Sequence, residues 1–134
     1  MRGSAFLADA RKMNAKLLVL VADDDPDIRQ LVRLRLERSG YDVISAGDGL
    51  SALELARERH PDVAILDISM PKMSGLEVAR VLREQRAALP VILLTARARD
   101  EDVLEGANAG VDRYITKPFS PQELESQVRE LAHV

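Results

Sequence analysis

Short, almost uninterrupted apolar runs alternate along this chain with longer segments whose apolar residues recur at helical spacing. This alternation limits the possible folds more than any other feature. The clearest apolar runs cover residues 17–22, 63–66 and 91–94, and two weaker runs cover residues 41–46 and 113–116. Continuous β-rich runs bounded by turn residues are typical of strands buried on both faces, as in a parallel sheet.

A segment with helical signals follows each apolar run. The first has Asp25 as N-cap, Pro26 at the first helical position and Gly40 just after its end. The others are a helix with Ala52, Leu53 and Ala56 that stops before Pro61, one from Ser74-Gly75 that ends before Pro90, one from Asp100 to near Gly110, and one that begins with a capping box at Ser120. Five strand–helix units predict a single doubly wound α/β domain, because parallel strands need helical crossovers.

Composition narrows the class of protein further. The chain has 134 residues, a usual size for one domain, and it contains no cysteine. Disulfides, thiolate metal sites and a cysteine nucleophile are therefore excluded. The only histidines are His60 and His133, which disfavours zinc, and the net charge of −3 argues against strong binding of a polyanion. We expect no direct binding of nucleic acid by this domain.

The chain carries no signal for a membrane or for secretion. No apolar stretch approaches the roughly 18 residues that span a bilayer, and the N-terminal residues lack a secretory apolar core. A cytoplasmic location is expected. Met-Arg-Gly-Ser at the start is typical of an expression leader, so we interpret residues 1–16 as an extension that is partly vector-derived and residues 17–134 as the domain.

Polar side chains follow four of the five predicted strands. Asp23, Asp24 and Asp25 follow the first strand, and Asp67 follows the third. Thr95 ends the fourth strand and Lys117 the fifth. In a doubly wound sheet, ligands bind outside the carboxyl ends of the strands, so the sequence predicts that these side chains share one site.

The residue types in this set favour phosphoryl chemistry. Clustered carboxylates repel each other unless a cation neutralises them, and Asp23, Asp24 and Asp67 supply the oxygen ligands that Mg²⁺ prefers. The Lys117 ammonium suits a phosphoryl oxygen, and Thr95 adds a hydroxyl donor. A carboxylate can also act as the nucleophile and form an aspartyl phosphate.

Each residue also has a simpler interpretation when it is taken alone. Asp25 is expected to serve only as a helix cap, and Asp67 could begin a turn. Thr95 suits a strand because it is β-branched, and a single lysine is usually a solvated charge. The joint position of these residues at one sheet edge favours the functional interpretation.

From residue 17 to residue 134 the chain resembles the receiver domain of two-component response regulators. The resemblance is carried by the acidic run at 21–26, the Asp-x-x-Met-Pro-x-x-x-Gly pattern at 67–75, and the segments 92–96 and 114–119. It implies a flavodoxin-like sheet of strand order 2-1-3-4-5 with five helices. It also implies a signalling domain that accepts a phosphoryl group and loses it by self-dephosphorylation, rather than a turnover enzyme.

The resemblance implies a role for each site residue. Asp67 would be the phosphoacceptor, and Lys117 would bind Asp67 and later a phosphoryl oxygen. Asp24, Asp67 and the main-chain carbonyl of Ser69 would ligate Mg²⁺, with Asp23 acting through water. Thr95 and Tyr114 would form the switch, although a single tyrosine in a strand is also common as a packing residue. The Lys117-Pro118 peptide is expected to be cis.

The resemblance further implies partners. The phosphodonor would be a sensor histidine kinase or a phosphotransfer protein, and the effector would be an output domain or a downstream protein. The fourth helix, fifth strand and fifth helix would form the reporting face and a possible homodimer interface. Asp112, Arg113 and Arg99 lie where related regulators form dimer salt bridges, although isolated surface charges contribute little to binding.

Other interpretations remain open from the sequence. A Mg²⁺-dependent phosphohydrolase of the haloacid-dehalogenase kind would use an Asp-x-Asp pair, formally present as Asp23 and Asp25, but it usually has a cap domain. An interaction module could keep the fold without being phosphorylated, yet Asp24, Asp67 and Lys117 are all present. A flavin-binding module is disfavoured, because acids rather than a phosphate-cradling glycine-rich loop follow the first strand.

Overall fold

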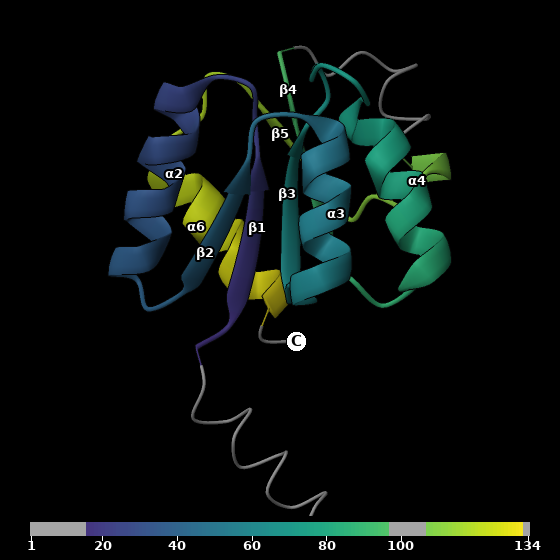
Figure 1. The fold of residues 1–134 in the computed structure, drawn as a ribbon. Helices are drawn as coiled ribbons and strands as arrows, with labels where there is room; N and C mark the ends of the chain where they lie inside the picture. The colour runs from purple at the N-terminus through teal and green to yellow at the C-terminus, as the bar shows by residue number, and fades with distance from the viewer. Residues whose placement is uncertain (1–15, 97–106, 133–134) are drawn as a thin grey trace, which may run out of the picture.

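Five parallel strands form one sheet in the order β2-β1-β3-β4-β5, as the family resemblance implies (Figure 1). The computed structural model describes residues 16–96 and 107–132. The strands are β1 (Leu18–Ala22), β2 (Asp42–Ala46), β3 (Val63–Asp67), β4 (Val91–Thr95) and β5 (Arg113–Thr116). Every predicted strand is confirmed, and no strand boundary differs from the prediction by more than one residue.

Helices cover both faces of the sheet. They are α2 (Pro26–Arg38), α3 (Gly49–Arg59), α4 (Gly75–Gln85) and α6 (Pro121–Ala132). Figure 1 shows α2 and α6 on one side of the sheet and α3 and α4 on the other. The helix predicted from Asp100 to near Gly110 lies largely outside the described residues, so four of the five predicted helices are seen.

The ends of α2 confirm the predicted helix signals. The Asp25 carboxylate accepts hydrogen bonds from the main-chain N–H groups of Asp27 at 2.9 Å and Ile28 at 3.4 Å. At the other end, Gly40 has a φ of +96°, a conformation that glycine adopts without a Cβ penalty. The Gly40 and Tyr41 N–H groups donate to the carbonyls of Glu37 and Leu36, which completes a Schellman motif.

Two apolar clusters, one on each face of the sheet, form the core. Successive strand residues point to opposite faces, and both faces of the central strands are apolar. The α3/α4 cluster includes Leu20, Leu66, Leu93, Leu53 and Leu82. The α2/α6 cluster includes Val21, Ile65, Leu94, Leu36 and Leu124. Burial from two sides explains why the strands appear in the sequence as continuous apolar runs.

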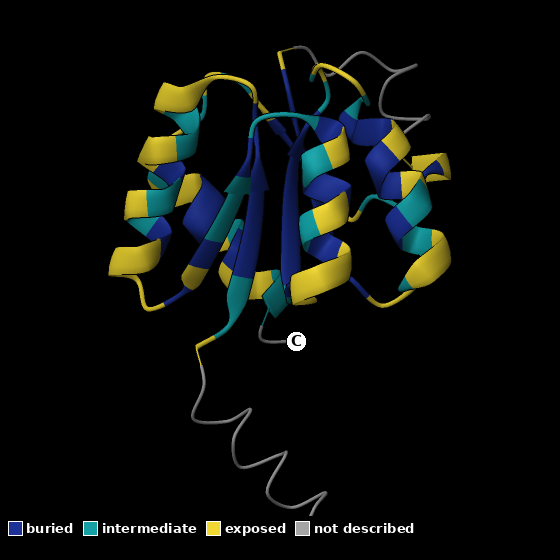
Figure 2. Cartoon of the chain, viewed as in Figure 1, coloured by how far each residue is buried: buried dark blue, intermediate teal, exposed yellow. Residues whose placement is uncertain are grey.

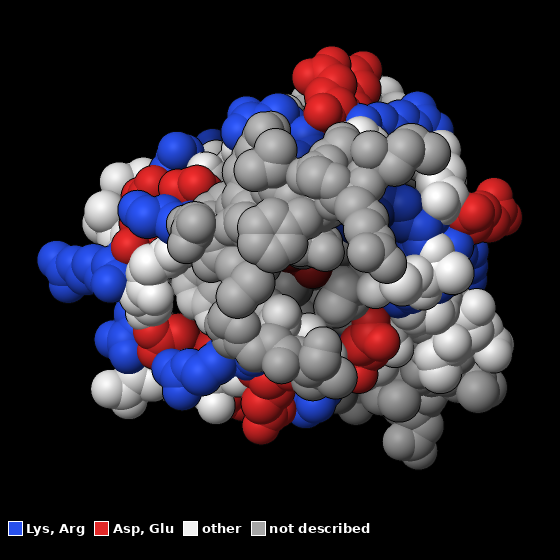
Figure 3. All heavy atoms as spheres, turned by 90° about the horizontal axis from the view of Figure 1, so that it is seen from below, with Lys and Arg blue, Asp and Glu red and all other residues white. Residues whose placement is uncertain are grey.

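The described surface carries many charged side chains, although Leu31, Leu34 and Leu50 are also exposed. Figure 2 shows buried strands and helices whose exposed residues face away from the sheet. In the view of Figure 3, basic and acidic side chains both occur around the described rim, which agrees with the nearly balanced net charge of −3. None of the helices in the described part of the chain is long and apolar enough to cross a membrane.

Candidate functional site

Strand register brings the predicted site residues to one edge of the sheet. Ala22 of β1 pairs with Leu66 of β3, so Asp23 and Asp67 come next on neighbouring strands. The Asp23 N–H donates to the Ala46 carbonyl at 3.1 Å and so extends the hydrogen bonding of the sheet by one residue. Thr95, which ends β4, pairs with Thr116, the residue before Lys117. The predicted convergence of these strand ends is therefore confirmed.

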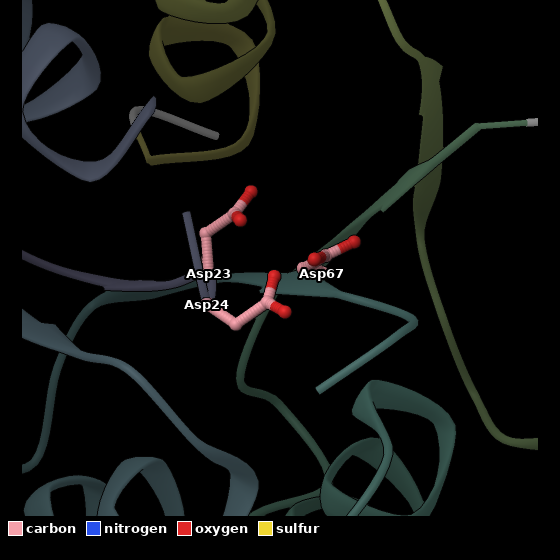
Figure 4. Close-up of side chains that lie close together, drawn as sticks. All are labelled: Asp23, Asp24 and Asp67. Carbon is pink, nitrogen blue, oxygen red and sulfur yellow. The ribbon is translucent and has the colours of Figure 1, made fainter. Parts of the chain in front are cut away.

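Three carboxylates meet at this edge. One oxygen from each of Asp23, Asp24 and Asp67 lies within 4.8 Å of the others. Figure 4 shows Asp23 and Asp24 extending from the end of β1 beside Asp67 at the end of β3. Asp23 is fully buried and Asp67 is 5% exposed, whereas Asp24 is exposed to solvent. The cluster is therefore open on the Asp24 side.

Lys117 places one positive charge inside this cluster. Its Nζ lies 2.8 Å from Asp23 Oδ2 and 3.4 Å from Asp67 Oδ1. Partial burial alone would lower the pKa of Lys117, but its pairing with Asp23 and the negative charge of Asp67 raise that pKa above its usual value. Lys117 is therefore a permanent cation at neutral pH. The peptide bond from Lys117 to Pro118 is cis, as expected.

The balance of charge is unfavourable for Asp67. Loss of solvent and the neighbouring Asp23 charge raise the pKa of Asp67 to about 6, although Lys117 opposes the shift. Lys117 therefore offsets only part of the combined effect of burial and the neighbouring carboxylates on this pKa. Asp67 remains mostly ionised at pH 7, which keeps its carboxylate available as a nucleophile.

The three carboxylates suit a magnesium ion. They offer hard oxygen donors on an open side of the site, as Mg²⁺ requires. Burial is the main cause of the raised pKa of Asp67, and a divalent cation would offset the further contribution from the negative charges of Asp23 and Asp24. Asp23 Oδ2 is buried and has no hydrogen-bond partner among the described residues. Within the described part of the chain, its negative charge is balanced by the ion pair with Lys117.

Thr95 and Tyr114 lie on the adjacent strands β4 and β5. Thr95 is buried at the end of β4, and Tyr114 of β5 pairs in register with Leu93. Tyr114 is half-buried and packs against the α3/α4 cluster. Because residues two apart in a strand share a face, the Thr95 and Tyr114 side chains project to the same side of the sheet. This placement is compatible with the predicted switch and also with a packing role for Tyr114.

The remaining predicted residues have simpler positions. Ser69 is exposed in the loop after β3. Asp25 caps α2, as described above, so it is not available as the second acid of an Asp-x-Asp hydrolase pair. Asp112 is engaged within the chain, because its Oδ2 accepts from the Val91 N–H at 2.8 Å and pairs with Arg83 at 3.1 Å.

Arg113 also has partners within the chain. Its Nη1 donates to Gln127 Oε1 at 3.0 Å and pairs with Glu130 Oε2 at 3.1 Å, both on α6. Arg99 lies outside the described residues. Use of Asp112 or Arg113 in a dimer would therefore require these internal contacts to be exchanged.

The sequence did not reveal how two residues, Arg29 and Gly75, support the site. Arg29 of α2 donates from Nη1 to the main-chain carbonyl of Asp23 at 2.8 Å. Gly75 packs so closely beneath Asp67 that a Cβ there would lie 2.2 Å from the Asp67 carbonyl oxygen. Gly75 belongs to the Asp-x-x-Met-Pro-x-x-x-Gly pattern, which was a signal for a special role. Arg29 had no comparable signal.

The fold and the site together define a doubly wound domain with a cluster of three carboxylates and a lysine at the carboxyl ends of its strands. The family described as the response regulator receiver domain matches residues 19–129. The chain belongs to this family, whose members are signalling domains of two-component systems.

Individual relatives agree with this placement. The chain is 44% identical over 119 residues to the alkaline phosphatase synthesis transcriptional regulatory protein PhoP of Bacillus subtilis, covering 89% of this chain and 49% of that protein. It is 46% identical over 113 residues to the probable transcriptional regulatory protein TcrX of Mycobacterium tuberculosis, covering 84% and 48%. The chain thus spans about half the length of these relatives.

Solved structures show the same fold. Chemotaxis protein CheY4 of Vibrio cholerae superposes with a TM-score of 0.84 at 35% identity, covering 87% of this chain and 99% of that one. The receiver domain of the Francisella response regulator 1452 superposes with a TM-score of 0.83 at 40% identity, covering 88% and 98%.

Proposed function

We propose that residues 17–134 form a receiver domain that accepts a phosphoryl group on Asp67. The observation that carries the proposal is the position of the Asp67 carboxylate, with Lys117 Nζ 3.4 Å away and two further carboxylates within 4.8 Å. A nucleophile, a fixed cation and a set of magnesium ligands thus occupy one site, as phosphoryl transfer requires.

In the proposed reaction, an Asp67 carboxylate oxygen attacks the phosphorus of a phosphohistidine on a histidine kinase or phosphotransfer protein. The new P–O bond forms as the P–N bond breaks, and the imidazole leaves as a neutral group after it takes up a proton. Hydrolysis of the acyl phosphate by water later releases inorganic phosphate and restores the carboxylate. The domain would thus act as a switch with self-dephosphorylation and not as a turnover enzyme.

The other residues have supporting roles. Asp23, Asp24, Asp67 and the Ser69 carbonyl would hold Mg²⁺, which when bound neutralises charge on the phosphoryl oxygens. Lys117 would transfer its contact from Asp67 to a phosphoryl oxygen. Thr95 would donate its hydroxyl to the same group, and Tyr114 would change position with it.

We infer a cytoplasmic role in which the modified face controls an output. Phosphorylation adds a charge of roughly −1.5 to −2 beside Thr95, and this charge would shift an existing equilibrium between two arrangements of the β5 and α6 face. Several relatives are named as transcriptional regulators, including a DNA-binding response regulator, MtrA of Mycolicibacterium smegmatis. A DNA-binding output domain is therefore the proposed effector, and homodimerisation through this face is a proposed step.

The test is the mass of the intact protein after incubation with acetyl phosphate, in Mg²⁺ or in EDTA. We expect the chain to gain one phosphoryl group in the sample with Mg²⁺ and none in the sample with EDTA. Asp67→Asn should abolish the gain, whereas Asp27→Asn, which neutralises an exposed acid in the first turn of α2, should leave it unchanged.

A phosphoryl gain that persists in Asp67→Asn would contradict the assignment of the phosphoacceptor. If the unsubstituted chain gains nothing, Mg²⁺-dependent binding of beryllofluoride distinguishes a strict need for a kinase from a module that signals without phosphate. Failure of both reactions would overturn the proposed function.

A further inference from the structure

Arg29 joins two loops at the acidic edge of the sheet. It lies in α2, and its Nη1 donates to the main-chain carbonyl of Asp23 at 2.8 Å. The same guanidinium lies against Gly47, in the segment between β2 and α3, where an added Cβ would be 2.9 Å from Nη1. The glycine thus leaves the space that this guanidinium occupies.

The carbonyl that Arg29 holds belongs to the peptide unit between Asp23 and Asp24. A peptide unit is planar, so a hydrogen bond that fixes the direction of this carbonyl also fixes the plane from which Asp24 extends. The rest of the Asp23 main chain is held by its N–H bond to Ala46 at 3.1 Å. The Asp24 side chain is exposed and makes no hydrogen bond or ion pair with the described residues, so its direction depends on its main chain.

We propose that Arg29 is a positioning residue for the cation site, which it serves by orienting the Asp23–Asp24 peptide so that the Asp24 carboxylate faces Asp67. Arg29 makes no ion pair with a carboxylate among the described residues. Its contact is with a main-chain oxygen, so its role is geometric. This inference rests on the proposed function, because that function supplies the need for a divalent cation at Asp23, Asp24 and Asp67.

The geometric role and a purely electrostatic role predict opposite effects. A positive charge near three carboxylates reduces their attraction for Mg²⁺, so removal of the charge alone would strengthen binding. Loss of the hydrogen bond would instead let Asp24 turn away and weaken binding. Groups that orient metal ligands typically contribute between 10-fold and 100-fold to metal affinity.

Gly47→Ala separates these two effects. The added methyl group would displace the guanidinium, which is the far end of a flexible side chain, and the charge of Arg29 would remain. Arg29→Gln removes both the charge and the guanidinium hydrogen bond to the Asp23 carbonyl. Arg29→Lys keeps the charge and one possible donor, and Arg38→Gln removes an exposed arginine from the last turn of the same helix as a control.

The experiment is a titration of the unphosphorylated chain with Mg²⁺ alone, followed by amide chemical shifts, with urea unfolding of each variant as a check on folding. We expect Arg29→Gln and Gly47→Ala each to weaken Mg²⁺ binding about tenfold. The double variant should bind Mg²⁺ no more weakly than either single variant, because both substitutions disrupt the same contact. Arg29→Lys should recover part of the affinity, and Arg38→Gln should bind as the unsubstituted chain does.

The positioning role would be overturned if Arg29→Gln bound Mg²⁺ more tightly, or if both Arg29→Gln and Gly47→Ala bound it with unchanged affinity. In either case, Mg²⁺ binding by the unsubstituted chain would still support the cation site. Absence of Mg²⁺ binding by the unsubstituted chain would overturn the proposed cation site as well. A Gly47→Ala chain that binds Mg²⁺ weakly but unfolds at the same urea concentration as the unsubstituted chain would support the role.

Discussion

Asp67 stands in surroundings that disfavour its own charge. It is 5% exposed, and Asp23 adds a second negative charge on the neighbouring strand. Lys117 compensates only in part, so the pKa of Asp67 is raised to about 6. Catalytic groups in such surroundings commonly reduce the stability of the fold, because the arrangement that serves the reaction is not the one that minimises repulsion.

This conflict predicts that Asp67→Asn stabilises the fold at neutral pH. The folded chain holds a proton on Asp67 up to pH about 6, whereas the unfolded chain releases it near the ordinary value of 3.8. The unfolded state therefore binds fewer protons in this window, and stability falls as the pH rises through it. Asparagine does not titrate. We expect Asp67→Asn to raise the free energy of unfolding at pH 7 by about 1–2 kcal/mol, with the difference shrinking toward pH 4.

Urea unfolding at pH 7 and pH 4 measures this difference. Asp42→Asn is a suitable control because Asp42 is exposed at the start of β2, and its substitution should change stability little at either pH. A stability difference for Asp67→Asn that is independent of pH, or that has the opposite sign at pH 7, would contradict the role of Asp67 as a source of strain.

At the scale of the elements, the strand–helix junctions decide how the site is built. The apolar runs predicted every strand, because burial from both faces leaves a continuous local pattern. The helix cap at Asp25 and the stop at Gly40 were also predictable, since they depend on the nearest residues alone. The acidic cluster followed from topology, because the carboxyl ends of parallel strands meet at one edge.

Contacts between distant segments could not be predicted in this way. A Cβ added at Gly49 would lie 1.9 Å from the Met73 carbonyl oxygen. No local pattern relates these two residues. The role of Arg29 was not predictable for a similar reason, because its target is a main-chain oxygen that the identity of a side chain does not encode. The family pattern marked Gly75, but it did not reveal that Asp67 is the residue it approaches.

Gly75 and Gly40 allow the two physical reasons for a glycine to be compared. A Cβ at Gly75 would meet the Asp67 carbonyl oxygen at 2.2 Å and its carbon at 2.9 Å, so Gly75→Ala must separate the start of α4 from the end of β3. Gly40 has open space around it but a φ of +96°. We expect Gly75→Ala to cost about 2–4 kcal/mol of stability and Gly40→Ala about 1 kcal/mol.

The same variants should differ in phosphorylation. Gly75→Ala displaces the main chain at Asp67, so the rate of phosphorylation by acetyl phosphate should fall, whereas Gly40→Ala lies at the far end of α2 and should leave the rate unchanged. Urea unfolding and the time course of the intact mass measure both effects. Equal phosphorylation rates in the two variants would show that the close approach of Gly75 serves stability alone.

At the scale of the whole molecule, the sheet is the element that the two apolar clusters share among the described residues. Leu93 and Leu94 are adjacent in β4 and fully buried, yet Leu93 belongs to the α3/α4 cluster and Leu94 to the α2/α6 cluster. A cavity on either side therefore weakens the same strand. The two clusters should unfold together, because loss of packing on one face leaves the sheet without its cover on that face.

The two tyrosines allow this cooperativity to be measured. The chain has no tryptophan, and Tyr41 lies in the α2/α6 cluster whereas Tyr114 packs against the α3/α4 cluster. In Tyr114→Phe the remaining fluorescence comes from Tyr41 and reports the α2/α6 face. In Tyr41→Phe it comes from Tyr114 and reports the α3/α4 face. We expect Leu93→Ala and Leu94→Ala each to lower the free energy of unfolding by about 2–5 kcal/mol. In each leucine variant, the fluorescence of Tyr41 and that of Tyr114 should give the same urea midpoint. The effect of each tyrosine substitution alone is subtracted first. If Leu93→Ala lowered the midpoint reported by Tyr114 but not the one reported by Tyr41, the two faces would be separate folding units, contrary to the two-state behaviour that a shared sheet predicts.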